Sequence, residues 1–225
     1  MRPSRWKKWL SYLTEFHIED APSDLNPALH VCLVNGRYQL CTENAIYSFG
    51  DLYNNFGDAF KKVRLEQLPG KEVLILGFGM GSIPILLEKK MAKKYHYTGI
   101  EIDEEVIYLA SKYILDELQS SIALICADAA KWVDQCEQRF DLIAIDLFLD
   151  DVIPHVFEQA AFLRQVQGLL NPKGLLLYNR LAYTLNDVEN ARRFFKGQFK
   201  PVFEKGTYLD LEGNWMLVND ERYLL

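Results

Sequence analysis

The stretch KEVLILGFGMGSIPILLEKKMAKKYHYTGIEID, residues 71 to 103, decides the fold. Val73 to Leu76 is an uninterrupted apolar run, typical of a strand buried on both faces of a parallel sheet. It runs into the glycine turn Gly77 to Gly81, after which a helix is expected. Tyr95 to Ile102 supplies a second strand, and Glu101 near its end stands 24 positions after the first glycine. This order predicts a nucleoside-binding unit.

The glycine turn alone is a weak signal, because a tight strand-to-helix connection without a ligand looks the same. Glu101 strengthens it, since a carboxylate at that strand end accepts hydrogen bonds from ribose hydroxyls. The glycines follow the pattern G-x-G-x-G, and Ser82 stands where the dinucleotide fingerprint has glycine or alanine. The pattern therefore favours S-adenosylmethionine or a relative over NAD.

Composition excludes several classes of function. A net charge of −6 over 225 residues argues against nucleic acid as an obligate partner. No apolar run of membrane-spanning length and no signal peptide is visible, so a cytoplasmic protein without membrane contact is expected. The four cysteines lack metal-ligand spacing and are interpreted as small buried hydrophobes. His155 and Glu158 are interpreted as a surface pair, and no metal site is predicted.

The rest of the chain divides into two parts, an N-terminal arm, β-hairpin and lead-in helix at 1–65 and a Rossmann-like domain at 66–225. In the second part strands alternate with helices, which predicts an α/β fold with a doubly wound, mainly parallel sheet. Strands are expected at 122–126, 140–146, 175–179, 201–204 and 215–219, and helices at 104–117, 128–135, 158–170 and 186–198. Ligands in such sheets bind outside the carboxyl ends of the strands.

Two features stand out before the glycine turn. Asn35-Gly36 predicts a two-residue hairpin turn in which Cys32 faces Gln39 and Cys41 faces His30, so that a disulfide there is not expected. The first 16 residues carry aromatic side chains at helical spacing among basic residues. This arm either lies on an anionic membrane or packs on its own domain or a second subunit, and the second interpretation is favoured because acidic residues follow it.

Several segments resemble the spermidine synthase (polyamine aminopropyltransferase) family, a branch of the S-adenosylmethionine methyltransferase superfamily. They are VLILGFGMGS, IEIDEEVIYLASKYI, CADAAKWV, FDLIAIDLFLDD and, upstream, NGRYQLCTENAIYSFGDLY. The resemblance implies a seven-stranded sheet of the class I methyltransferase type with a small N-terminal β-hairpin element, S-adenosylmethionine or its decarboxylated form as cofactor, a small-molecule acceptor and a homodimer. Carried onto this sequence, the cofactor-binding residues are Gln39, Gly77, Phe78, Gly79, Gly81, Glu101, Ile102, Ala127, Asp128 and Asp146.

The chain departs from the family at the substrate end. Met80 replaces an aspartate of the glycine loop, and Phe49 replaces a substrate-binding tyrosine. Leu149 stands where the gate loop has its second aspartate, and Asp150 and Asp151 follow it. Tyr178, Asn179 and Arg180 end a strand beside the cleft and either contact the acceptor or form a plain strand end.

Three functions remain open from these residues. An aminopropyltransferase must take a proton from an amine that is cationic at neutral pH, for which Asp146, Asp150 and Asp151 are the catalytic candidates. Loss of the aspartate at Met80 makes the pocket less hostile to a carboxylate, which favours S-adenosylmethionine. Methyl transfer to a small molecule is therefore the main interpretation, aminopropyl transfer the alternative, and a catalytically silent nucleoside-binding homologue the second alternative.

Overall fold

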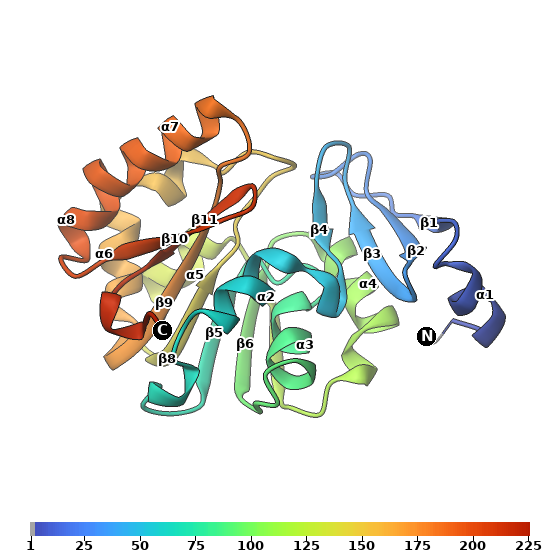
Figure 1. Cartoon of the computed structure of the whole chain (residues 1–225), viewed down its shortest axis with the longest axis horizontal. Helices are drawn as coiled ribbons and strands as arrows, with labels where there is room; N and C mark the ends of the chain where they lie inside the picture. Colours follow the sequence, from blue (N-terminus) through green and yellow to red (C-terminus); the bar gives the residue numbers. More distant parts are fainter. Residues whose placement is uncertain (1–2) are drawn as a thin grey trace.

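The computed structural model describes residues 3–225 and contains two sheets (Figure 1). The larger has seven strands in the order β10-β11-β9-β8-β5-β6-β7. Their bounds are β5 Glu72–Leu76, β6 His96–Glu101, β7 Ile122–Cys126, β8 Phe140–Ile145, β9 Leu170–Leu181, β10 Thr207–Leu211 and β11 Asn214–Val218. Strands β5 to β9 pair in parallel, and β11 pairs antiparallel with both β9 and β10. The predicted mainly parallel, seven-stranded sheet is confirmed.

Helices cover both faces of this sheet because its strands carry apolar side chains on both sides. The helices α2 (Asn54–Lys61), α3 (Ser82–Lys89) and α4 (Glu104–Tyr113) pack on one face, nearer the viewer in Figure 1. The other face holds α5 (Ala129–Gln135), α6 (Ala160–Gly168) and α7 (Leu185–Phe194). Two hydrophobic cores result, one on each side of the sheet. None of the helices within residues 3–225 is long and apolar enough to cross a bilayer.

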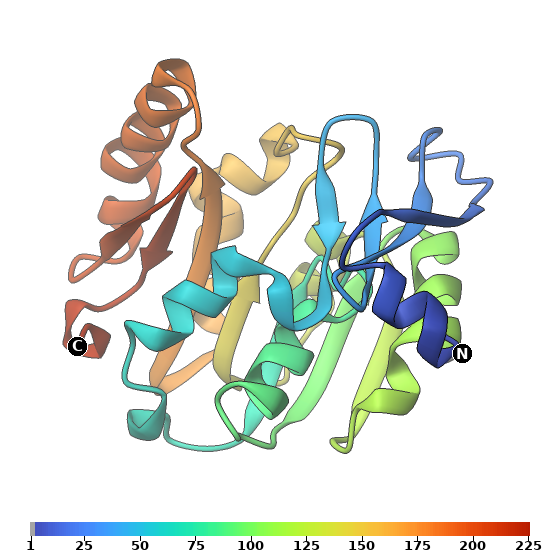
Figure 2. The same ribbon diagram turned by 45° about the vertical axis from the view of Figure 1, so that its right-hand side comes forward.

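The smaller sheet has four antiparallel strands in the order β1-β2-β3-β4. They are β1 Phe16–Asp20, β2 His30–Val34, β3 Arg37–Cys41 and β4 Ile46–Ser48. The hairpin register matches the prediction, with Cys32 opposite Gln39 and His30 opposite Cys41. All four cysteines are free, as expected. Figure 2 shows this sheet standing over the carboxyl ends of the large sheet, beside the loop that follows β8.

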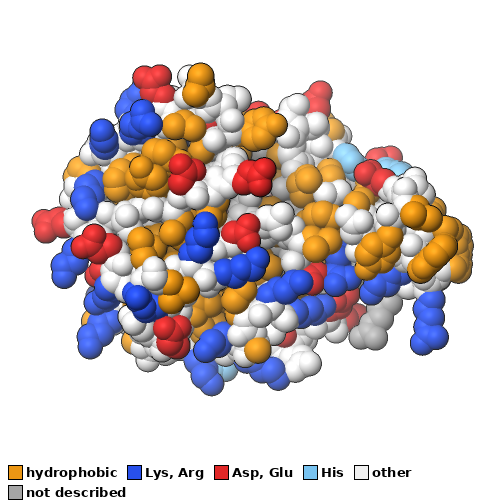
Figure 3. All heavy atoms as spheres, in the orientation of Figure 1, with side chains coloured by type: hydrophobic (Ala, Val, Ile, Leu, Met, Phe, Trp, Pro, Cys, Tyr) orange, Lys and Arg blue, Asp and Glu red, His pale blue; other side chains and the backbone are white. Residues whose placement is uncertain are grey.

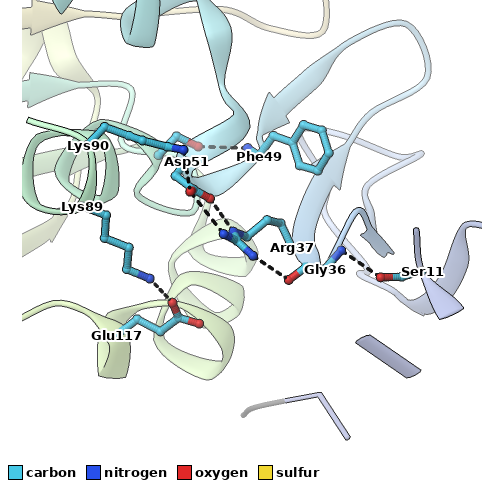
Figure 4. A network of polar contacts seen from close by, with 9 residues as sticks. Ser11, Gly36, Arg37, Phe49, Asp51, Lys89, Lys90 and Glu117 are labelled. Atoms are coloured by element: carbon cyan, nitrogen blue, oxygen red, sulfur yellow. Dashed lines mark hydrogen bonds and ion pairs between the residues drawn. The ribbon is translucent and has the colours of Figure 1, made fainter. Parts of the chain in front are cut away.

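A cluster of charges fastens the small sheet to the large domain (Figure 4). Arg37 on β3 donates from Nε and Nη2 to the buried carboxylate of Asp51, which lies in the short 3₁₀ helix η1 (Gly50–Leu52). Lys90, just after α3, approaches the same carboxylate at 3.2 Å. Burial opposes ionisation, but the two cations hold the pKa of Asp51 at about 2. The cluster fixes the strand end that carries Phe49.

Several local predictions were wrong. Residues 201–204 are not a strand: the chain passes from α7 through a π-helical turn, Phe195–Phe199, into α8 (Lys200–Val202), where proline suits a first helical turn. The strand starts instead at Thr207. The strand expected at 175–179 is present, although it belongs to the longer β9. The lead-in helix expected before residue 65 is interrupted at Tyr53, which adopts an extended conformation between η1 and α2.

The predicted burial of the cysteines is only partly right. Cys126 is exposed, and only Cys32 is fully buried. The helix α1 (Arg5–Leu10) is present, and the residue after it, Ser11, accepts hydrogen bonds from the N–H groups of the hairpin turn, but Trp6, Trp9 and Leu13 are exposed. Packing of these aromatic side chains on a second subunit stays a prediction. Apolar side chains gather at that end of the molecule, on the right in Figure 3. The homodimer stays a prediction.

Candidate active site

A cleft of about 780 Å³ opens at the carboxyl ends of the parallel strands. It lies over the point where β5 has β6 on one side and β8 on the other, the position at which doubly wound sheets bind ligands. One half, next to β5, β6 and β7, contains Gly77, Gly79, Glu101 and Asp128. We call this the nucleoside half. The acceptor half lies over β8, β9 and β11, and β4 and the loop after β8 form its walls.

Close backbone packing explains the glycine turn. Gly77 has a φ of +82°, and a Cβ there would lie 2.1 Å from the backbone oxygen of Asp146. No other residue fits, because the left-handed conformation and the contact both exclude a side chain. The N–H of Gly79 donates to Oε2 of Glu101 at 2.9 Å. The turn and the carboxylate at the end of β6 are therefore one unit.

Glu101 is an acceptor held by the backbone. Its Oε1 accepts hydrogen bonds from the N–H groups of Ile102 and Asp103, in addition to the bond from Gly79 to Oε2. Burial raises the pKa of Glu101, and these three donors oppose that rise. The carboxylate lines the cleft in a fixed orientation, as contacts to ribose hydroxyls require.

Asp128 and Asp103 both cap helices. Oδ1 of Asp128 accepts from the N–H groups of Ala130 and Lys131 at the start of α5. Within residues 3–225 no donor reaches its Oδ2, which remains for a ligand. Asp103 caps α4 through the N–H of Glu105; it is buried and does not line the cleft.

Asp146 stands between the two halves. Its Oδ2 accepts from the hydroxyl of Tyr53 and its Oδ1 from the amide of Asn179, both at 2.9 Å. Burial raises the pKa of Asp146 to about 6, although both hydrogen bonds act in the opposite direction. A carboxyl group with this pKa exchanges a proton near neutral pH, which suits a general base.

The loop after β8, which we call the gate loop (147–157), is fastened to the small sheet. The carboxylate of Asp150 accepts from Thr42 Oγ1, from Asn44 N and from Asn44 Nδ2. The hydroxyl of Tyr47 accepts from the N–H of Asp150 and donates to the carbonyl of Phe148. The hydrogen bonds from Asn44 and Thr42 lower the pKa of Asp150. Asp150 is therefore a weaker base than Asp146, whose pKa is raised.

The charged residues that line the cleft, within residues 3–225, are all acidic. Six carboxylates line it, namely Glu101, Asp128, Asp146, Asp150, Asp151 and Glu212. No lysine, arginine or histidine within residues 3–225 lines it. Figure 3 shows acidic side chains near the centre of this view with apolar and basic ones beside them; the basic ones do not line the cleft. A low-dielectric cleft of one sign concentrates cations and repels anions.

The structure brings most of the predicted site residues together. Those that line the cleft are Gly77, Gly79, Glu101, Ile102, Asp128, Asp146, Asp150 and Asp151. Gln39, Phe78, Gly81 and Ala127 do not line it. Phe78 is buried with its ring against Gly99 and Gly81, so its side chain serves packing. The roles of all these residues stay predictions.

Sequence reasoning missed several lining residues. Tyr53 donates a hydrogen bond to Asp146 although the two are 93 positions apart in the sequence, and Glu212 comes from the β10–β11 turn. No spacing rule links these positions. Asn179 was named as an acceptor contact and does line the cleft, whereas Tyr178 and Arg180 do not. Alternation along β9 explains the difference, because it turns Asn179 toward the cleft and Arg180 toward Glu158.

Comparison with known proteins agrees with this geometry. A family model described as a methyltransferase domain matches residues 68–210. The chain therefore belongs to the methyltransferase-domain family. One relative is a probable polyamine aminopropyl transferase of Bifidobacterium longum, 33% identical over 106 residues that cover 47% of this chain and 23% of the relative. A polyamine aminopropyltransferase of Saccharolobus islandicus is 27% identical over 161 residues, covering 67% of this chain and 53% of the relative.

A solved structure extends the match to the fold. The spermidine synthase of Thermotoga maritima superimposes with a TM-score of 0.70 at 18% identity, covering 90% of this chain and 72% of that one. At this identity the similarity concerns the fold alone. The chain spans about half of the Saccharolobus relative and about a quarter of the Bifidobacterium one.

Proposed function

We propose that this chain is a spermidine synthase-like transferase that binds a sulfonium nucleoside and transfers its aminopropyl group to an amine. The donor is decarboxylated S-adenosylmethionine. This reverses the order favoured by the sequence, in which methyl transfer came first. The curated relatives, which are aminopropyltransferases by name, support the reversal.

The observation that carries the proposal is the charge of the cleft. A sulfonium centre and an alkylammonium are both cations, which the carboxylates attract. The tail carboxylate of S-adenosylmethionine would enter the same space, where no cationic side chain of residues 3–225 is present to pair with it. Desolvating an unpaired carboxylate is costly. The decarboxylated donor avoids that cost.

The residues fit such a donor. Glu101 and the open Oδ2 of Asp128 are placed for ribose hydroxyls and the adenine amino group. A bound sulfonium nucleoside supplies an electrophilic carbon next to sulfur. The amine nitrogen forms the new C–N bond as the C–S bond breaks toward sulfur, which leaves a neutral thioether. Asp146 takes the proton that the nitrogen loses, and Tyr53 and Asn179 hold its carboxylate in place.

Methyl transfer is the second candidate, and one observation favours it. Met80 stands where the resemblance calls for an aspartate, and it is buried in the core without lining the cleft. The carboxylate that would hold the donor's amino group is thus missing. The matched family model is also described as a methyltransferase domain.

A product assay separates the candidates. The protein is incubated with a mixture of amines and either donor, and mass spectrometry reads whether an aminopropyl or a methyl group was added. Asp146→Asn serves as the inactive control. We expect aminopropylated amine with the decarboxylated donor. Methylated product from S-adenosylmethionine would establish the second candidate, and nucleoside binding without any product would favour the silent homologue.

A further inference from the structure

The acceptor half of the cleft has an apolar wall that faces solvent. Ile46 on β4, Leu149 and Val156 on the gate loop all line the cleft, yet they are 48%, 46% and 47% exposed. Large apolar side chains grouped in one cleft mark a binding surface, whereas single ones scattered on a surface do not. The wall is therefore built to cover an apolar part of a ligand.

The position of Leu149 is fixed by the backbone. Leu149 and Val152 exchange two hydrogen bonds, of 2.8 and 3.1 Å, which close a tight turn. Inside this turn Asp150 has a φ of 54°, a conformation that aspartate adopts more readily than most residues. The turn directs the carboxylate of Asp150 to Thr42 and Asn44. Leu149 is thereby presented to the cleft, while the neighbouring carboxylate of Asp150, which also lines the cleft, is bound by Thr42 and Asn44.

A second apolar side chain is held from the opposite side. The N–H of Phe49 donates to Oγ of Ser82 at 2.9 Å, and Ser48 Oγ lies 2.7 Å from the same oxygen. These bonds attach the end of β4 to the first residue of α3, immediately after the glycine turn. Phe49 lines the cleft, and so does Leu52 in the following turn. The wall is rigid on both sides.

Few carboxylates remain for a second positive charge. Glu101 and Asp150 each accept three hydrogen bonds from the protein, and the open oxygen of Asp128 is assigned to the nucleoside. Asp151 and Glu212 are exposed at the mouth, where water solvates them and any ion pair is weak. One cation can thus pair with Asp146, which lies between the two halves. The space beyond Asp146 is lined by apolar groups.

We propose that the acceptor is an amphipathic amine and not a diamine. Its one ammonium is directed at Asp146, and its apolar body lies against Leu149, Phe49 and Ile46. This rests on the proposed function, because it assumes that the cleft accepts an amine. It goes further by assigning the chemical class of the acceptor and the residues that select it.

The first test compares amines by calorimetry. Butylamine, hexylamine, phenethylamine and putrescine are titrated into the protein saturated with methylthioadenosine, and again into the free protein. Each methylene buried against the wall is expected to raise affinity about fourfold. Hexylamine should therefore bind roughly tenfold or more tightly than butylamine. Putrescine should bind more weakly than hexylamine, because its second ammonium would lie against apolar side chains.

Variants locate the effect. Leu149→Asp should weaken hexylamine binding about tenfold and strengthen putrescine binding, because it exchanges an apolar contact for an ion pair. Val152→Asp is the matched control: it lies in the same turn, is 62% exposed and does not line the cleft. We expect it to change neither affinity. Methylthioadenosine binding and thermal unfolding of both variants check that they are folded.

The outcomes separate this inference from the proposed function. Putrescine binding as tightly as hexylamine in the wild type, or a Leu149→Asp variant that behaves like Val152→Asp, would overturn the amphipathic acceptor. Absence of nucleoside binding would instead contradict the proposed function, and the titrations of free protein would still decide the amine preference.

Discussion

The two halves of the cleft are constructed by different means. In the nucleoside half, backbone N–H groups of the glycine turn and of the end of β6 hold Glu101, all within one βαβ unit. In the acceptor half, the wall is assembled from β4, the gate loop and the ends of β9 and β11, joined by side-chain hydrogen bonds across more than a hundred residues of sequence. Local backbone geometry tolerates little change, whereas side chains on joined loops are replaced easily.

This difference explains where the chain departs from its family. The glycine turn and Glu101 match the spermidine synthase pattern, and the departures at Phe49 and Leu149 lie in the acceptor half. Met80 is the exception, since it belongs to the glycine turn but is buried in the core. The proposed function therefore expects a donor site of the spermidine synthase type beside an altered acceptor wall.

The largest effect is expected at the boundary between the halves. Asp146→Asn removes the proton acceptor, and turnover should fall by about a hundred- to ten-thousand-fold while donor affinity changes little. Steady-state rates and donor titration measure this. Asp151→Asn is the comparison, expected to alter turnover only a few-fold because its side chain is exposed at the mouth. A greater loss of turnover in Asp151→Asn than in Asp146→Asn would identify Asp151 as the proton acceptor.

The nucleoside half is tested by Glu101→Ala. It removes charge-assisted hydrogen bonds to ribose and the anchor of Gly79, so nucleoside affinity should fall about a hundredfold, or roughly 2.7 kcal/mol. Calorimetry with methylthioadenosine measures the loss. The control Glu104→Ala removes an exposed carboxylate that does not line the cleft. Equal affinities of the two variants would show that Glu101 makes no nucleoside contact.

The attachment of the acceptor wall is tested by Asp51→Asn. The depressed pKa of Asp51 means that its contribution to stability is present above about pH 4 and is lost as pH falls through about 2. At neutral pH the substitution should therefore lower the free energy of unfolding by about 1–2 kcal/mol. It should weaken amine binding and leave nucleoside binding unchanged.

Asp58→Asn is the matched control for this ion pair. Asp58 pairs with Lys61 on the surface of α2, where ion pairs contribute between zero and about 1 kcal/mol. Urea unfolding of both variants gives the comparison. A nucleoside affinity that falls together with the amine affinity in Asp51→Asn would mean that the two halves are not independent.

The smallest effect concerns pH. Turnover should rise as pH passes about 6, because Asp146 accepts a proton only when it is ionised. Tyr53→Phe removes a hydrogen bond to its carboxylate, raises the pKa further and should move the midpoint upward by roughly half to one unit. Tyr97→Phe is the control, since that buried hydroxyl contacts no partner among residues 3–225. An unshifted midpoint in Tyr53→Phe would show that the pH dependence of turnover does not come from Asp146.

Local patterns predicted the nucleoside half well. The apolar run of β5, the glycine turn and the hairpin register depend on neighbouring residues, and all appear in the structure as expected. The next-to-last strand was placed wrongly at 201–204, because Pro201 and two nearby aromatic residues fit a helix end as well as a strand. Periodicity over four residues does not separate these alternatives.

The acceptor half could not be predicted from sequence in the same way. Asp150 was a catalytic candidate by type and position, yet its hydrogen bonds from Thr42 and Asn44 depend on contacts 108 and 106 residues apart in the sequence. The bond from Tyr53 to Asp146 is equally distant, and Glu212 comes from a different hairpin. Side-chain type indicates what a residue can do, but its partners follow from tertiary packing.

Calorimetric titration of the wild-type protein with decarboxylated S-adenosylmethionine and with S-adenosylmethionine tests the central claim most directly. The two donors differ by one carboxylate. That carboxylate would enter a cleft whose charged lining residues, within residues 3–225, are all acidic. We predict that the decarboxylated donor binds at least about tenfold more tightly, or roughly 1.4 kcal/mol. Equal or tighter binding of S-adenosylmethionine would contradict the assignment of this cleft to aminopropyl transfer.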